Sequence, residues 1–521
     1  MAKHFPGFTW RALRCRPAVT TAGAKHRGPA VPTQVLVALV ALLILPGFVF
    51  ASPDDVGLDT PGEAIVGIWR GQRASQPGWD LVFEVTEATD GSLQGLGFWL
   101  EQGGLNSAFP LDEVALDASD GTVRLRYGAV VLAASLNATG DILTGALEYG
   151  EQSEPLAMER VSLEQVPGLY PRLPVAGERY VYAYEPPADT GDGWDVSTLE
   201  AEGFDAATME ALVQAVADGE FALIHSLVVV RNGRLVMDEY FYGYTSEVPH
   251  ALQSATKSVT SLLVGLAYDQ GLISGVNVLI LDFLPEHADA AGEGWEGVTL
   301  EHVLTMTVGA EWPADGWRNA FYGADDRFAA ALEHPIVHEP GTQFAYVSPN
   351  VDLLAGVIRH ATGAHCDEFA AEHLFGPLGI DTYDWDNLRW RGYPLCDGSL
   401  RLRSRDMAKL GQMMLDGGAW RGEQVISDEW VTRSLARHAI EEDEEGYGYL
   451  WWLTEKDVGG HSVVGYFASG FGSQFIFILP QFDLVVVTTG GNLDNGQHWA
   501  TGRMIEGYIL PALVAGGGLG Q

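Results

Sequence analysis

A serine and a lysine three residues apart, Ser254 and Lys257, have side chains and a spacing that could do chemistry. Residues three apart share a helix face, so the two side chains can meet where a helix begins. A serine hydroxyl is a weak nucleophile until a base takes its proton, and a desolvated lysine can be that base. Only five of the 30 basic residues are lysine, and arginine cannot release its proton. The spacing also fits a helix-capping serine beside an exposed lysine.

Two further segments contain groups that could assist such a serine. Tyr346 and Ser348 lie in "PGTQFAYVSPNVDLL", just before an expected helix, and a tyrosine beside a lysine can give or take a proton. The run 470–472 is Gly-Phe-Gly before an expected strand, where glycines let the backbone approach a substrate and offer an N–H to an oxyanion. Ordinary loop packing and a simple turn are the alternatives.

In order and rough spacing, these three elements resemble the serine β-lactamase and penicillin-binding-protein superfamily. The likeness is greatest to the branch that holds class C β-lactamases, family VIII-type esterases and 6-aminohexanoate-dimer hydrolase. It rests on "HSLVVVRNGRLVMDEYF", "LQSATKSVTSLLVGLA", "PGTQFAYVSPNVDLLAGVI" and "ASGFGSQFIFILP". The resemblance covers roughly residues 175 to 512 and leaves the N-terminal region outside.

This resemblance implies a role for each matching residue. Ser254 would be the acylated nucleophile, Lys257 its activating base, and Tyr346 the group that passes the proton to the leaving group. The family's Y-x-N motif is matched by Tyr346-Val347-Ser348, so Ser348 replaces the asparagine.

The third motif of the family, often K-T-G, is matched by Gly470-Phe471-Gly472. Phe471 would give its backbone N–H, paired with that of Ser254, as the oxyanion hole. Loss of the motif's lysine removes a cationic partner for a substrate carboxylate and puts efficient β-lactam turnover in doubt. By analogy, Trp452 and Tyr449 line the pocket, and core packing is the alternative for both.

The expected elements that position these groups fall into two regions. Residues 60–165 read as short strands between turns such as Asp90-Gly91, which predicts a small antiparallel β domain. Further on, 226–244 predicts a hairpin around Asn232-Gly233, and helical spacing predicts helices at 254–271, 299–307, 350–363 and 404–418. Strands expected at "YGYLWWL", "SQFIFILP" and "LVVVTTGG" suggest that the first and last strands share one sheet.

We therefore expect three parts: residues 1–51 as a signal peptide or anchor, 52–165 as a β-rich accessory domain, and 166–521 as a hydrolase domain. The resemblance implies an α/β (α+β) β-lactamase-like fold for the last part. Its antiparallel sheet would be flanked by helices, with a helical subdomain, and a small all-β domain would precede it.

The N-terminal region predicts export. Residues 1–34 carry six Lys or Arg and no acidic residue, and the apolar run 35–51 ends in Val49 and Ala51, small residues suited to cleavage after Ala51. We expect a secreted or periplasmic protein. A retained N-terminal anchor facing outside is the alternative, although the run is short and contains Pro46.

Charge and cysteine content limit the partners. The net charge of −39 disfavours nucleic acid and anionic lipid. The resemblance implies a small-molecule ester or amide as the substrate, and we expect membrane contact only through a retained anchor. No metal or organic cofactor is expected. Cys366 and Cys396 could pair in an exported chain or remain buried thiols, and Cys15 lies in the segment expected to be removed.

Competing motifs fail on spacing. "GHSVVG" lacks the second glycine of G-x-S-x-G, because position 464 is valine. His334 and His338 are four apart, but Pro335 between them disfavours a helical zinc pair.

The sequence therefore predicts an exported serine hydrolase acting through an acyl-enzyme on Ser254. The alternatives are a β-lactamase, a D-amino-acid-type peptidase, or a non-catalytic binding protein on the same fold.

Overall fold

The computed structural model describes residues 64–74, 79–101, 107–117, 119–150, 152–172, 180–313, 316–385, 390–440, 445–458, 461–493 and 495–515. The predicted signal or anchor and Cys15 lie outside these ranges. Within them, no helix combines the length and the apolar character needed to cross a membrane.

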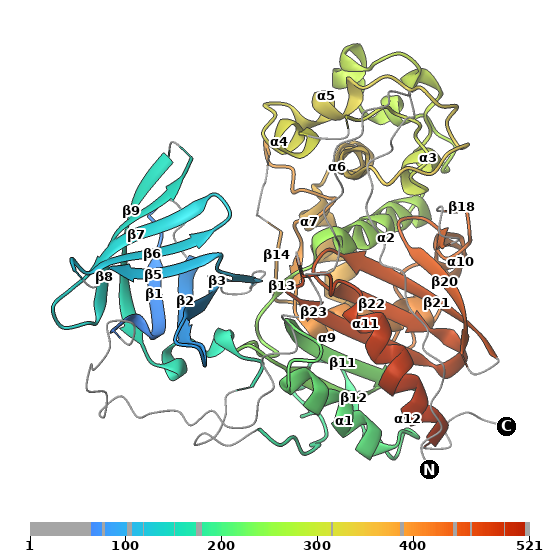
Figure 1. Ribbon diagram of the computed structural model, residues 1–521. Coiled ribbons are helices and arrows are strands. Elements are labelled where there is room, and N and C mark those ends of the chain that lie inside the picture. The colour runs from blue at the N-terminus through green and yellow to red at the C-terminus, as the bar shows by residue number, and fades with distance from the viewer. Residues whose placement is uncertain are drawn as a thin grey trace, which may run out of the picture.

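The first part of the described chain is a nine-stranded antiparallel sheet with the strand order β4-β3-β2-β1-β9-β8-β7-β6-β5. Its strands are β1 (Gly67–Gln72), β2 (Trp79–Glu87), β3 (Leu93–Glu101), β4 (Ser107–Pro110), β5 (Glu113–Asp117), β6 (Thr122–Tyr127), β7 (Val130–Leu136), β8 (Ile142–Tyr149) and β9 (Gln152–Val161). Alternate residues such as Trp69, Phe83 and Leu125 form its own buried core. Figure 1 shows this sheet, in blue and cyan, beside the larger part of the molecule.

Residues 162–194, between β9 and β10, connect the two parts. The Tyr170 hydroxyl donates to Glu84 of β2, and the next residue's carbonyl, Pro171 O, accepts from Tyr242 N at 3.0 Å. Arg172 forms an ion pair with Glu239 at 2.6 Å. Tyr170 therefore contacts the first sheet, whereas Pro171 and Arg172 contact β12 and the residues just after it.

The second sheet has the order β10-β12-β11-β23-β22-β21-β20-β19-β18. Its strands are β10 (Asp195–Val196), β11 (Ile224–Arg231), β12 (Arg234–Tyr240), β18 (Ala439–Ile440), β19 (Gly446–Tyr447), β20 (Trp452–Val458), β21 (His461–Gly470), β22 (Gln474–Leu479) and β23 (Leu484–Gly490). β11 pairs antiparallel with β23, which confirms that the first and last strands share one sheet. The predicted hairpin is also confirmed: Asn232 and Gly233 turn with φ of 50° and 69°, as a tight hairpin turn requires.

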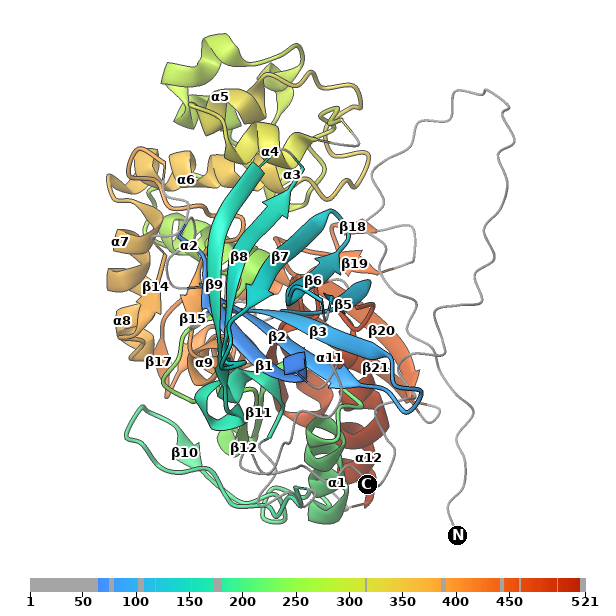
Figure 2. The ribbon, with the colours of Figure 1, turned by 60° about the vertical axis from the view of Figure 1, so that its left-hand side comes forward.

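Helices cover both faces of this sheet and form a separate layer above it (Figures 1 and 2). The helices are α1 (Ala206–Ala217), α2 (Thr256–Asp269), α3 (Leu300–Leu304), α4 (Trp317–Tyr322), α5 (Arg327–Leu332), α6 (Ser348–Thr362), α7 (Cys366–Ala370), α8 (Gly376–Leu378), α9 (Ser404–Leu415), α10 (Asp428–Ser434), α11 (Ala500–Met504) and α12 (Leu510–Ala515). Gly411 of α9 packs against Ile476 of β22, whereas the neighbouring Phe475 contacts Trp499 just before α11. Because side chains alternate along a strand, α9 and α11 lie on opposite faces.

Small strand pairs complete the fold. β15 (Arg401–Leu402) pairs with both β13 (His250–Ala251) and β14 (Tyr383–Asp384), and β16 (Ala419–Trp420) pairs with β17 (Glu423–Gln424). β13 leads directly into the segment that contains Ser254, so its pairing with β15 fixes where that segment begins.

One strand predicted from the sequence is wrong in detail. "YGYLWWL" is two strands, β19 and β20, because Leu450 between them adopts a left-handed φ of 60° that ends the extended backbone. The predicted helices at 254–271, 299–307, 350–363 and 404–418 are confirmed as α2, α3, α6 and α9, with shorter bounds for α3.

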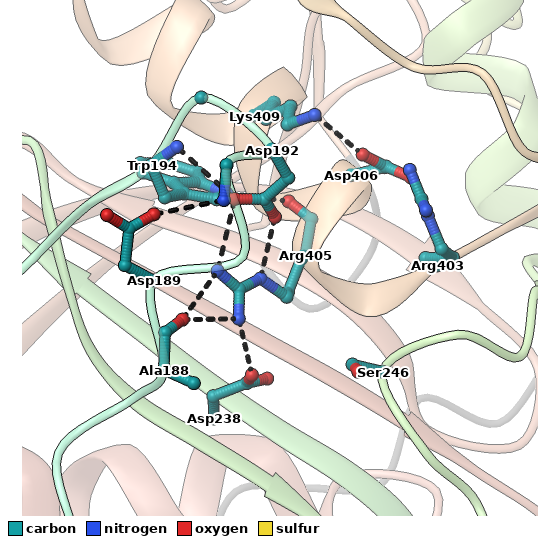
Figure 3. Close-up of polar contacts among 12 residues, drawn as sticks. Ala188, Asp189, Asp192, Trp194, Asp238, Ser246, Arg403, Arg405, Asp406 and Lys409 are labelled. Atoms are coloured by element: carbon teal, nitrogen blue, oxygen red, sulfur yellow. Dashed lines mark hydrogen bonds and ion pairs between the residues drawn. The ribbon is translucent and has the colours of Figure 1, made fainter.

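A buried arginine holds the long segment before β10 against the sheet (Figure 3). Arg405 of α9 donates to Asp192 at 2.7 Å, to Asp238 of β12 at 3.0 Å and to the Ala188 carbonyl at 3.3 Å. One turn along, Lys409 pairs with Asp406 at 2.8 Å and is fully buried. Among the residues that the structure describes, Lys257 and Lys409 are the buried lysines, and Lys257 is the one that contacts a serine.

Candidate active site

Ser254 lies in a short 3-10 helix, Gln253–Ala255, that runs straight into α2. Gln253 has a φ of 50°, a left-handed conformation that costs energy for a residue with a Cβ. The turn leaves Ser254 half-buried at the N-terminal end of α2, where the helix dipole favours negative charge.

Lys257 lies in the first turn of α2 with only 1% of its surface exposed. Its Nζ donates to Ser254 Oγ at 2.9 Å and to the Asp397 carbonyl at 2.6 Å. The structure therefore brings together the serine and lysine that the sequence singled out. The alternative of an exposed lysine beside a helix cap does not fit this burial.

Tyr346 completes a cluster around the lysine. Lys257 Nζ lies 5.3 Å from the centre of the Tyr346 ring. That ring stacks on Trp452 of β20 with centroids 5.6 Å apart, and meets Tyr447 of β19 edge-on at 6.3 Å. Ser348, the residue in the place of the motif's asparagine, is the first residue of α6.

Tyr449 packs against a different set of residues from Tyr346. Its hydroxyl donates to Glu301 at 2.6 Å, and its ring stacks on His438 with centroids 4.4 Å apart. Tyr447, which the sequence analysis did not select, is the tyrosine that contacts Tyr346. The alternation of side chains along a strand could not show which tyrosine faces Tyr346, because the chain turns at Leu450.

The run 470–472 closes the other side of the serine. β21 ends at Gly470, where an added Cβ would lie 2.0 Å from the Leu252 carbonyl oxygen and 3.1 Å from Ala255 N. Only glycine lets the strand approach the Ser254 turn so closely. Phe471 follows with its side chain half exposed, and Gly472 has a left-handed φ of +94°.

A histidine missed by the sequence analysis holds this turn. His498 Nδ1 accepts hydrogen bonds from the backbone N–H groups of Gly472 at 3.2 Å and Ser473 at 3.3 Å. Burial lowers the pKa of His498 to about 4, which favours the neutral ring that can accept these bonds. Nothing in the sequence near position 498 marks it, since its partners lie about 25 residues earlier.

A second missed residue, Asp397, lies on the far side of Lys257. Its carbonyl accepts from Lys257, and its carboxylate accepts from the Tyr322 hydroxyl at 2.8 Å. Nearby, Asp352 pairs with Arg327 at 3.0 Å, and burial raises the pKa of both carboxyls. The lysine therefore lies in a buried set of charged and polar groups drawn from four separate segments.

No group of three or more His, Cys, Asp or Glu residues in the described ranges is arranged to hold a metal ion. His334 instead packs its ring on Trp312, with centroids 4.0 Å apart.

The pKa of His498 leads to a prediction about acid stability. The unfolded chain binds a proton at this histidine near pH 6.5, whereas the folded chain resists protonation down to about pH 4. Its contribution to folding is therefore fully present above about pH 7 and is lost as the pH falls. Between pH 7 and pH 5, wild type should lose about 2 kcal/mol more unfolding free energy than His498→Gln.

Urea unfolding of the two proteins at pH 7 and pH 5 measures this difference. Glutamine keeps an acceptor for the two backbone N–H groups but does not titrate, so other acidic and basic groups cancel in the comparison. An unfolding free energy that depends equally on pH in the two proteins would contradict the lowered pKa of His498.

Comparisons with known proteins show which family the chain resembles. Residues 224–499 match the family model described as "Beta-lactamase", a span that begins at β11, ends just before α11 and includes Ser254, Lys257, Tyr346 and Phe471. A 6-aminohexanoate-dimer hydrolase of Paenarthrobacter ureafaciens is 27% identical over 301 residues, or 53% of this chain and 74% of that protein. A lovastatin esterase of Penicillium rubens is 24% identical over 193 residues, or 32% of this chain and 46% of the esterase.

Solved structures that match part of this chain include a family VIII carboxylesterase, with a TM-score of 0.46, 18% identity, and coverage of 56% of this chain and 92% of the carboxylesterase. A penicillin-binding protein homologue from Pyrococcus abyssi has a TM-score of 0.46 and 20% identity, and the match covers 58% of this chain and 77% of the homologue.

Proposed function

The chain belongs to the β-lactamase family of serine hydrolases, and from that premise we propose that it cleaves an ester or amide bond through an acyl-enzyme on Ser254. The observation that carries this proposal is the 2.9 Å contact between Ser254 Oγ and the Nζ of the buried Lys257. A buried lysine against a serine supplies the base that a hydroxyl nucleophile needs.

In the proposed reaction, Lys257 takes the Ser254 proton as Oγ attacks the carbonyl carbon of the substrate. The developing oxyanion accepts hydrogen bonds from the backbone N–H groups of Ser254 and Phe471. Tyr346, whose ring centre lies 5.3 Å from Lys257 Nζ, passes its hydroxyl proton to the leaving alcohol or amine and takes back from Lys257 the proton that came from Ser254. A water molecule then hydrolyses the acyl-enzyme and restores the serine.

The substrate follows from what the site offers. The Tyr346 ring lies beside the lysine and packs on Trp452 and Tyr447, and position 470 is glycine where many β-lactamases carry the K-T-G lysine. This favours small esters and amides over β-lactams, whose carboxylate that lysine would bind. The named relatives, a 6-aminohexanoate-dimer hydrolase and a lovastatin esterase, support an amide or ester substrate.

A substrate panel tests the proposal. Purified protein and Ser254→Ala are assayed with p-nitrophenyl esters, short ω-amino-acid amides, a D-amino-acid anilide and nitrocefin. We expect wild type to turn over an ester or amide faster than nitrocefin, and Ser254→Ala to lose this activity. Folded wild type without activity on any of these substrates would favour the binding-protein alternative, and activity retained in Ser254→Ala would exclude the mechanism.

We also propose that the protein is exported, from the basic opening and the apolar run 35–51. Cell fractionation followed by the mass of the mature N-terminus tests this proposal. A chain that begins at Ser52 outside the cytoplasm supports cleavage. A full-length chain in the membrane fraction supports the anchor, and a full-length chain in the cytoplasm would contradict export.

A further inference from the structure

Two buried cysteines lie against each other, and one of them directly precedes Asp397, whose carbonyl contacts Lys257. Cys366 begins α7, and Cys396 lies 30 residues later, directly before Asp397. Both side chains are fully buried, and both are thiols in the structure. Their Sγ atoms are 2.6 Å apart, closer than unbonded sulfur atoms pack and near the bonded separation of about 2.05 Å.

The segment around Cys396 is anchored on several sides. Its N–H donates to Asp352 at 3.0 Å, and its carbonyl accepts from Thr260 of α2 at 2.8 Å. The next carbonyl, that of Asp397, accepts from Lys257 at 2.6 Å. A bond at Cys396 would therefore act one residue away from a direct contact of the lysine.

We propose that Cys366 and Cys396 form a disulfide in the oxidised protein, and that this bond holds the Asp397 carbonyl in place against Lys257. The two thiols lose two protons and two electrons, and a small disulfide such as oxidised glutathione takes them up to become two thiols. The disulfide itself does not depend on the proposed function. Its effect on catalysis through Lys257 rests on that function.

The surroundings make this a structural bond rather than a reactive one. Burial raises the pKa of the Cys396 thiol, and the thiolate is the form that exchanges. Exchange in the folded protein is therefore slow in both directions. The bond should form while the chain folds in an oxidising compartment, and it should then resist reduction.

The bond is tested by peptide mapping. The full chain is produced in hosts with an oxidising and a reducing cytoplasm, denatured, and alkylated without reductant. We expect a cross-linked peptide pair containing Cys366 and Cys396 only from the oxidising host, with Cys15, where retained, alkylated as an internal free thiol. Alkylation of both buried cysteines in all molecules from the oxidising host would overturn the proposal.

Its consequence is tested by comparing wild type with Cys366→Ala, each from both hosts. Oxidised wild type should melt about 5 °C higher than reduced wild type, as expected for closing a loop of this length. Its kcat should be several-fold higher with KM little changed, and Cys366→Ala should show no difference between hosts.

Equal kcat of oxidised and reduced wild type would contradict the link to Lys257, even where the melting temperatures differ. Absence of activity in every form, with the cross-linked peptide present, would instead count against the proposed function and leave the bond standing.

Discussion

Replacing Lys257 with alanine is expected to lower kcat/KM by about 10³-fold, because Ser254 loses the group that takes its proton. Lys257→Arg should be almost as inactive. Arginine keeps a positive charge at this position but cannot release its proton. Burial raises the pKa of Asp397, so this carboxyl can take up a proton when the lysine is absent, and the fold should survive.

Lys409→Arg is the matched control, since Lys409 is equally buried and also lies in an i,i+3 arrangement, with Asp406, but does not contact a serine. Steady-state kinetics and circular dichroism of all three variants make the comparison. Lys409→Arg should retain activity close to wild type. Acylation by Lys257→Arg within a few-fold of wild type would remove the lysine as the base.

Gly470→Ala is expected to impair both the site and the fold. Its Cβ would lie 2.0 Å from the Leu252 carbonyl oxygen, which is backbone and cannot rotate away. β21 and the Ser254 turn must therefore separate, and the Phe471 N–H moves with the strand. Overpacking of this kind costs about 1–3 kcal/mol, and loss of one oxyanion donor lowers kcat about 10²–10³-fold.

Gly398→Ala provides the comparison, because it lies one residue from Asp397 and an added Cβ there meets no atom within 4 Å. Thermal unfolding and kcat should both stay near wild type in Gly398→Ala and fall in Gly470→Ala. Wild-type kcat in Gly470→Ala would show that the position of the Phe471 N–H does not matter to the reaction.

Local patterns predicted much of this molecule. Asn-Gly between apolar runs predicted the β11–β12 hairpin, and the spacing of Ser254 and Lys257 predicted their contact. In both cases the residues that interact are close together in the sequence, so their spacing alone is enough to predict the contact.

Residues that meet through the tertiary fold could not be predicted in this way. Asp397 contacts Lys257 across 140 residues, and His498 reaches the 470–472 turn from the segment before α11. In both contacts one partner is a backbone group, so the type of that residue gives no sign of the contact. The same limit explains the choice of Tyr449 over Tyr447, which depended on a left-handed Leu450 that no motif indicates.

The central claim is that Ser254 Oγ is the nucleophile that becomes acylated. Its most direct test is reaction of the purified protein with a fluorophosphonate, followed by peptide mass spectrometry of the labelled site. We expect one label, on the peptide that contains Ser254, and no label in Ser254→Ala of wild-type stability. A label on another serine, or folded wild-type protein that does not react, would contradict the account.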